Sequence, residues 1–89
     1  MKVIVTVIGK DCVGIIASVC TLLADCNVNI LDISQKVMGG YFTMIMIADA
    51  AECTVDFVEL SERLQAKGKE KGVDIRLQRE DIFDAMHRI

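Results

Sequence analysis

The two consecutive glycines Gly39 and Gly40 constrain the fold of this chain more than any other local feature. They join residues 28–38 (VNILDISQKVM) to residues 41–49 (YFTMIMIAD), both rich in strand-forming side chains. A two-residue turn between antiparallel strands needs positive φ angles at both positions, which glycine adopts at low cost. The sequence therefore predicts a long β-hairpin in the middle of the chain. In its first strand we expect one face to carry Leu31, Ile33 and Val37.

The segment before the hairpin predicts a strand followed by a helix. Residues 3–8 (VIVTVI) form a β-branched run that is typical of a central strand. From Val13 the apolar residues follow helical spacing, and the helix should end near Asn27, a residue that tolerates the left-handed conformation. The apolar side of this helix is expected to carry Ile16, Val19, Cys20 and Leu23.

A second helix and a last strand are predicted after the hairpin. We expect Thr54 to cap the start of the helix and Gly72 to end it. Residues 73–79 (VDIRLQR) alternate between apolar and polar side chains, as a half-buried strand does. Residues 80–89 (EDIFDAMHRI) predict a short amphipathic helix. The buried side of the second helix is expected to carry Phe57, Val58, Leu60 and Leu64.

The resulting order, β-α-β-β-α-β followed by a helix, is that of the ferredoxin-like α+β fold. Two right-handed crossovers place both helices on one face of a four-stranded antiparallel sheet. We expect residues 1–89 to form one domain, with the βαββαβ core at residues 1–79 and the C-terminal helix at residues 80–89. Since residues 41–49 are apolar on both faces, the open face needs a cover, either the C-terminal helix or a partner subunit.

The composition argues for an interface and against several classes of function. Of the 89 residues, 53% are hydrophobic, and so much apolar surface in so short a chain predicts a contact between subunits. The net charge of −3 argues against a nucleic-acid partner, which usually needs a basic patch. No apolar run approaches the ~20 residues that span a membrane. Four irregularly spaced cysteines and a start without signal-peptide character predict a cytoplasmic protein with reduced thiols.

The loop of residues 9–14 (GKDCVG) has the chemistry of a small anion site. Its glycine spacing resembles a phosphate loop, but Ile15 and Ile16 stand where a lysine and a hydroxyl residue belong, so nucleotide binding is unsupported. The first turn of the following helix offers free backbone N–H groups to a carboxylate, and Gly14 lets a ligand approach them closely. Asp11 could accept an ammonium group. In a simpler interpretation, which stays open, Asp11 only caps the helix and Gly14 only allows close packing.

With these features together, the sequence resembles the ACT domain, a small βαββαβ regulatory module of amino-acid metabolism. The resemblance covers nearly the whole chain and rests on residues 9–35 (GKDCVGIIASVCTLLADCNVNILDISQ) and 39–49 (GGYFTMIMIAD). The usual family loop reads Asp, a basic residue, Pro, Gly and Ile or Leu. This chain matches it at Asp11, Gly14 and Ile15, and departs from it at Cys12 and Val13. The chain is also similar to the small free-standing ACT proteins of bacteria.

The resemblance implies a regulatory homodimer that binds an amino acid or a related small molecule and has no catalytic activity. In the family, the site lies between the first loop of one subunit and the second strand of its neighbour, often with two sheets joined side by side. The loop contributors would be Asp11, Cys12, Val13, Gly14 and Ile15. The second strand would contribute Asn29, with Ile30 and Asp32 nearby. A regulated protein partner is implied, and the alternative is a purely structural dimerisation module without ligand.

Three rival functions of the same fold have weaker support in the sequence. An RNA-binding module would use Tyr41 and Phe42 for stacking, but the first strand has no aromatic residue and the chain is acidic. A soft-metal carrier would need a Cys-x-x-Cys pair where only Cys12 is present, although a redox role for this thiol at a helix start is conceivable. A phosphatase would need an arginine in the first loop, and His87 has no evident partner. We therefore expect no catalysis, metal or cofactor.

Overall fold

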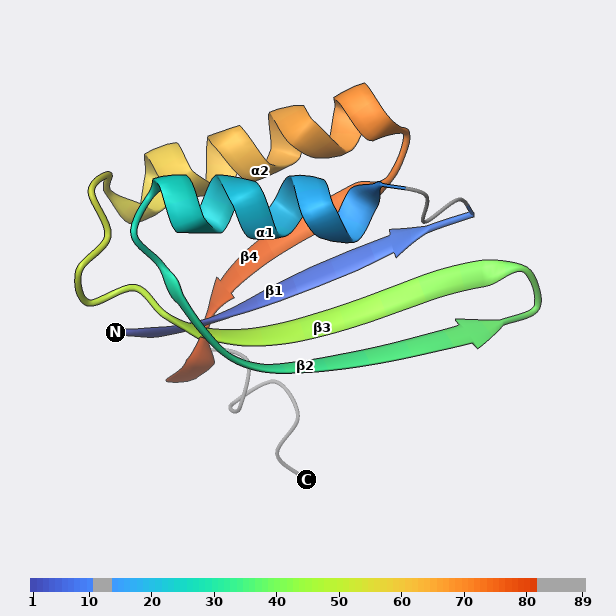
Figure 1. The fold of residues 1–89 in the computed structure, drawn as a ribbon, viewed down its shortest axis with the longest axis horizontal. Coiled ribbons are helices and arrows are strands. Elements are labelled where there is room, and N and C mark those ends of the chain that lie inside the picture. Colours follow the sequence, from blue (N-terminus) through green and yellow to red (C-terminus); the bar gives the residue numbers. More distant parts are fainter. Residues whose placement is uncertain (11–13, 82–89) are drawn as a thin grey trace.

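The computed structural model describes residues 1–10 and 14–81 and confirms the predicted order and fold (Figure 1). Four strands form an antiparallel sheet in the order β2-β3-β1-β4, and both helices cover one face of it. The predicted C-terminal helix falls mostly outside the described residues, which include only its first two positions. The elements are β1 (Lys2–Gly9), α1 (Ile15–Asp25), β2 (Asn29–Met38), β3 (Tyr41–Asp49), α2 (Phe57–Lys71) and β4 (Asp74–Arg79).

The hairpin between β2 and β3 forms as predicted. Gly39 and Gly40 have φ angles of 57° and 82°, and Met38 pairs with Tyr41 directly beside the turn. One irregularity lies further along the hairpin, where Ile30 pairs with Ala48 but the next pair in register joins Asp32 to Ile47. Strand pairs assigned by counting residues outward from the turn are therefore wrong by one residue beyond this point.

The register bears out part of the predicted face of β2, because Ile33 and Val37 lie on the same side of the sheet. Leu31 falls at the irregularity and has no cross-strand partner. Ile33 and Val37 pair with Met46 and Phe42, on the side of the sheet that the helices cover.

The core lies between the sheet and the helices. Alternate residues of β3 are buried on the helix side, among them Met44 and Met46, which have no exposed surface. On the opposite face of β3, Tyr41 and Ile45 remain 49% and 36% exposed. This confirms that β3 is apolar on both faces.

The packing of α2 on the sheet depends on one glycine. Leu60 and Leu64 of α2 are buried as predicted, and Gly68 continues the same face one turn later. A Cβ on Gly68 would lie 2.7 Å from the carbonyl oxygen of Val73, so glycine lets the helix approach the start of β4 closely. Gly72, with a φ angle of 74°, ends the helix as predicted.

The starts of both helices differ from the prediction. α2 begins after Asp56, whose side chain accepts a hydrogen bond of 2.8 Å from the N–H of Glu59, so Thr54 is not the cap. Val58 is 64% exposed and does not belong to the buried face. α1 begins at Ile15 with Gly14 as its N-cap, two residues later than predicted, so Asp11 is not the N-cap either.

Within residues 1–10 and 14–81, the structure contains no helix of the length and apolarity that a bilayer crossing requires.

Candidate functional site

Gly14 gives α1 an open N-terminal end. Its φ angle of 74° lies in the left-handed region, it is exposed, and a Cβ added to it would meet nothing within 4 Å. The N–H of Ser18 donates to the Gly14 carbonyl over 3.0 Å, which is the first intrahelical bond. The N–H groups of Ile15, Ile16 and Ala17 precede that bond and have no acceptor within the helix. This end of α1 is therefore suited to a carboxylate.

The other predicted loop residues are placed unevenly. Asp11, Cys12 and Val13 lie outside the described residues. Ile15 is only 1% exposed and belongs to the core, so its side chain is not a ligand contact in this structure.

Lys10 provides a positive charge directly after β1, at the end of the sheet that carries the first loop. The Nζ atom of Lys10 lies 5.7 Å from the centre of the Tyr41 ring, which ties the first loop to the hairpin. The sequence interpretation had given Lys10 no role, although it directly precedes Asp11.

The strand residues of the predicted site lie at the opposite end of the sheet. Gly9 pairs with Phe42, whereas Asn29 pairs with Asp49 at the far end of β3. Seven residue steps of β3 separate these two pairs, which corresponds to roughly 23 Å at the rise of a strand. One chain therefore does not bring Gly14 and Asn29 together.

Asn29 lines a hollow of about 440 Å³ between the end of α1 and the start of β2. Ile30 is half-buried beside it, and Asp32 is exposed and accepts a 2.9 Å hydrogen bond from the N–H of Ile33. The lining consists of Ala24, Asn27, Val28, Asn29, Asp49, Ala51 and Glu52.

Asp49 is the residue of this hollow that sequence reasoning missed. The N–H of Ala51 donates to its Oδ1 over 3.0 Å and holds the pKa of the Asp49 carboxyl below its ordinary value. Desolvation opposes this shift, and the N-terminal ammonium group 3.5 Å away adds to it. The carboxylate thus already faces one ammonium group. Counting residues outward from the hairpin turn comes within one residue of the pair formed by Asp49 and Asn29. The count is off by one because of the irregularity at Leu31.

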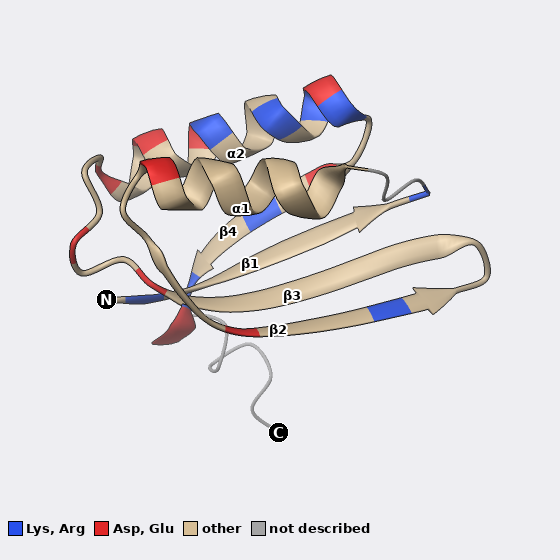
Figure 2. Cartoon of the chain, viewed as in Figure 1, with Lys and Arg blue, Asp and Glu red and all other residues tan. Residues whose placement is uncertain are grey.

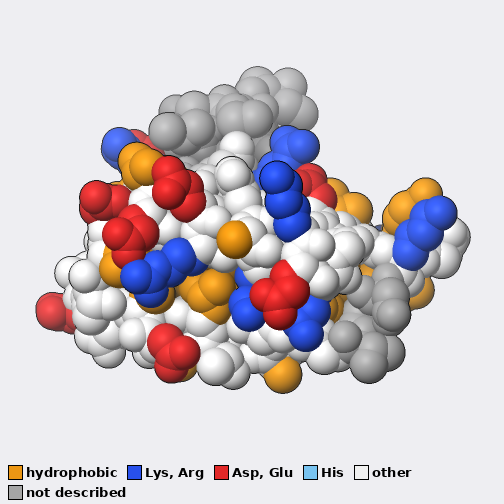
Figure 3. Space-filling model, turned by 90° about the horizontal axis from the view of Figure 1, so that it is seen from above, with side chains coloured by type: hydrophobic (Ala, Val, Ile, Leu, Met, Phe, Trp, Pro, Cys, Tyr) orange, Lys and Arg blue, Asp and Glu red, His pale blue; other side chains and the backbone are white. Residues whose placement is uncertain are grey.

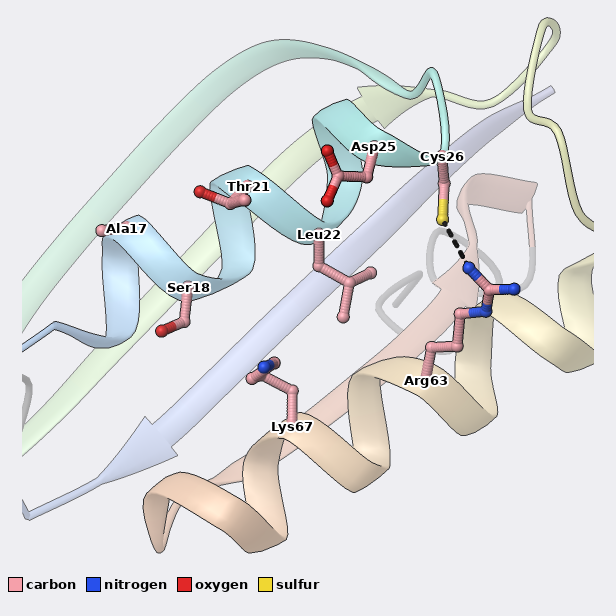
Figure 4. Close-up of a pocket in the computed structure, with 8 residues that line it drawn as sticks. All are labelled: Ala17, Ser18, Thr21, Leu22, Asp25, Cys26, Arg63 and Lys67. Atoms are coloured by element: carbon pink, nitrogen blue, oxygen red, sulfur yellow. Dashed lines mark hydrogen bonds between the residues drawn. The ribbon is translucent and has the colours of Figure 1, made fainter.

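A second hollow, of about 470 Å³, lies between α1 and α2 (Figure 4). Arg63 and Lys67 extend from α2 toward α1, where Ser18 and Asp25 also line the hollow. Both cations already have carboxylate partners, at 2.6 Å for Arg63 and 3.4 Å for Lys67. With Asp25 added, carboxylates outnumber cations here, so this hollow has no net attraction for an anion.

The charges of α2 follow the polarity of that helix. α2 carries Glu59 in its first turn and Lys69 and Lys71 in its last turn, which matches the helix dipole (Figure 2). Seen over the helices, acidic and basic side chains are interspersed, and the described residues form no continuous basic patch in this view (Figure 3). The described residues also contain no group of three or more His, Cys, Asp or Glu side chains able to hold a metal ion.

The family model described as ACT domain matches residues 2–78, and the chain belongs to the ACT domain family. Among its relatives, the UPF0237 protein of Listeria innocua is 51% identical over the whole of both chains. The UPF0237 protein of Clostridium acetobutylicum is 53% identical, again over the whole of both chains. The membership supports a regulatory, ligand-binding role at the level of the family.

The solved structures agree on the fold. An ACT domain protein from Streptococcus pneumoniae has a TM-score of 0.84 and 42% identity, with 98% of each chain covered. A formyltetrahydrofolate deformylase from Pseudomonas syringae has a TM-score of 0.78 and 26% identity; 88% of this chain aligns with 27% of the enzyme. In that enzyme the same fold is one part of a longer chain.

Proposed function

We propose that this chain is a non-catalytic regulatory module that binds an amino acid or a related small ligand between two copies of itself. The proposal rests on the start of α1 at Gly14, which has no side-chain cap and where a Cβ would meet nothing within 4 Å. Such an end attracts a carboxylate through its N–H groups and the helix dipole. The proposed loop contributors are Asp11, Cys12, Val13, Gly14 and Ile15.

A second copy is needed because the two halves of the site lie at opposite ends of one sheet. β2 is an edge strand, and Leu31, Val37 and Met38 on it are 48%, 69% and 61% exposed. An edge strand of this kind is a template for pairing with another chain. Two β2 strands paired antiparallel about a two-fold axis would bring Asn29 of the second copy to the end of the sheet that carries Gly14.

The chemistry of the two halves is complementary to an amino acid. The carboxylate would bind the N–H groups of α1, and the ammonium group would bind the strand half of the second copy. That half offers the amide of Asn29 and the carboxylate of Asp49, with Ile30 and Asp32 close by. A ligand that contacts both copies stabilises one arrangement of the dimer, and this coupling would pass a signal to a regulated protein partner, in the cytoplasm.

A thermal-shift screen of the standard amino acids tests the proposal. A ligand at 100 times its Kd should add about 2.7 kcal/mol to the free energy of unfolding. The matched variants are Gly14→Ala and Gly72→Ala, because both glycines have a φ angle of 74° and open space around a Cβ. Each should lose about 1–2 kcal/mol of stability through left-handed strain. Only Gly14→Ala should lose the ligand response, and an unchanged response in Gly14→Ala would contradict the site.

A purely structural dimerisation module is the second candidate, and the exposed apolar edge of β2 favours it. This alternative predicts a dimer by light scattering with no shift for any amino acid. A dimer that responds to an amino acid excludes it.

A further inference from the structure

We propose that Cys26 and Cys53 are a redox modification site, in which the two thiols form a reversible disulfide within one chain. This inference is independent of the ligand site. Cys26 caps the C-terminal end of α1, and Cys53 lies in the connection between β3 and α2. The end of α1 and this connection lie at the same end of the molecule (Figure 1).

Two hydrogen bonds hold these segments together. The N–H of Thr54 donates to the carbonyl of Cys26 over 3.0 Å, and Nδ2 of Asn27 donates to the carbonyl of Glu52 over 3.0 Å. Cys26 and Cys53 thus occupy adjacent backbones, joined by the same kind of bond that keeps neighbouring strands roughly 5 Å apart. A disulfide spans Cα atoms roughly 4.4–6.8 Å apart, so the backbone spacing fits.

Both side chains are directed to the core. Cys26 is 1% exposed and belongs to the buried cluster, and the half-buried Cys53 packs against that cluster. Cys20 is the other described cysteine, and it lies six residues before Cys26 on α1, roughly 9 Å along the helix axis. That separation makes Cys20 a poor partner for Cys26.

The difference in burial assigns the order of reaction. A low-molecular-weight disulfide first meets Cys53, whose thiolate attacks it, forms a mixed disulfide and releases one thiol. Cys26 then attacks the sulfur of Cys53, forms the internal disulfide and releases the second thiol. Two protein thiols are oxidised while the added disulfide is reduced to two thiols. Arg63 stands beside the attacking sulfur, with its Nη1 donating to Sγ of Cys26 over 3.7 Å (Figure 4).

The disulfide would tie the end of α1 to the connection before α2. Asn29 follows Cys26 by three residues, so oxidation would also fix the backbone around the hollow that Asn29 and Asp49 line. Because the cross-link closes a loop of more than 25 residues, the oxidised chain should melt at a temperature higher by at least about 5 °C.

The test uses the full chain with Cys12→Ser and Cys20→Ser, which leaves only the proposed pair. After treatment with oxidised glutathione, the intact mass should fall by about 2 Da, with no glutathione attached and no covalent dimer. Trypsin should then release residues 11–36 linked to residues 37–63. Dithiothreitol should restore the mass and the melting temperature.

Single variants separate the role of Cys53, which reacts first, from that of Cys26, which forms the internal disulfide. Cys26→Ala should trap glutathione on Cys53, whereas Cys53→Ser should remain largely unmodified because Cys26 is buried. A glutathione adduct that persists on Cys53 while Cys26 is present would overturn the proposal. So would an oxidised product that links two chains rather than two segments of one chain.

Discussion

Replacing Gly68 by alanine should destabilise the protein, although alanine is the better helix former. In an exposed helix the change would add about 1 kcal/mol of stability. Here the new Cβ would lie 2.7 Å from the carbonyl oxygen of Val73 and 3.2 Å from Cγ1 of Ile75. The first contact is closer than real Cβ atoms show, and it involves backbone that cannot rotate away.

The size of the expected loss in stability follows from this overlap. The N–H of Val73 donates to the Gly68 carbonyl over 2.9 Å, so relieving the clash would strain the bond that joins α2 to β4. Overpacking of this kind costs typically 1–3 kcal/mol, and against the helix gain we expect a net loss of about 1–2 kcal/mol. For a domain of this size, the Tm should fall by roughly 5–15 °C.

Urea unfolding of Gly68→Ala provides the measurement, with Ala66→Gly as the control on the exposed side of the same helix. Ala66→Gly reports helix propensity alone and should cost about 1 kcal/mol. If propensity decided both cases, Gly68→Ala would stabilise the protein by a similar amount. A gain in stability, or no change, would refute the close packing of α2 on β4.

Three further changes test other parts of the account. Asp56→Ala should lower the free energy of unfolding by about 1 kcal/mol in urea, because the cap on the Glu59 N–H is lost, whereas Asp56→Asn should preserve most of it. The pKa of Asp49 is lowered in the folded state, so its ionised carboxylate stabilises the fold at any pH above the pKa that this group has in the unfolded chain. This stabilisation is lost as the pH falls through the pKa of the folded state. The difference in Tm between wild type and Asp49→Asn should therefore shrink below about pH 4. Val37→Lys should shift the protein toward monomer in light scattering, while Val58→Lys should not, although the two side chains are 69% and 64% exposed.

The hairpin and the element order were predictable because their signals are local. Gly39 and Gly40 mark a turn whose backbone geometry few other residues adopt, and the change from alternating to helical spacing marks the elements around it. The same local logic failed at the start of α2. Thr54 and Asp56 are both residue types that cap helices well, and local sequence does not say which of them accepts the bond from the helix; in the structure it is Asp56.

The candidate site was predictable only in part, because it depends on distance between segments. The loop glycine at Gly14 is visible in the sequence, and the structure gives it a left-handed conformation at the start of α1, whereas its role as a ligand contact stays a prediction. The distance between Gly14 and Asn29 depends on how the strands are ordered and paired in the sheet, which local sequence patterns do not determine. Asp49 was missed because its pairing with Asn29 depends on the irregularity at Leu31.

Mixing two defective variants tests whether a small ligand binds between two copies of the chain. Gly14→Ala should disable the loop half of the site and Asn29→Ala the strand half, so neither homodimer should bind the amino acid found in the screen. In an equal mixture, half of the dimers contain one chain of each kind, and each of these has one intact site. Calorimetric titration should then recover about a quarter of the wild-type sites. No recovery in a mixture shown to exchange subunits would contradict a site shared between chains.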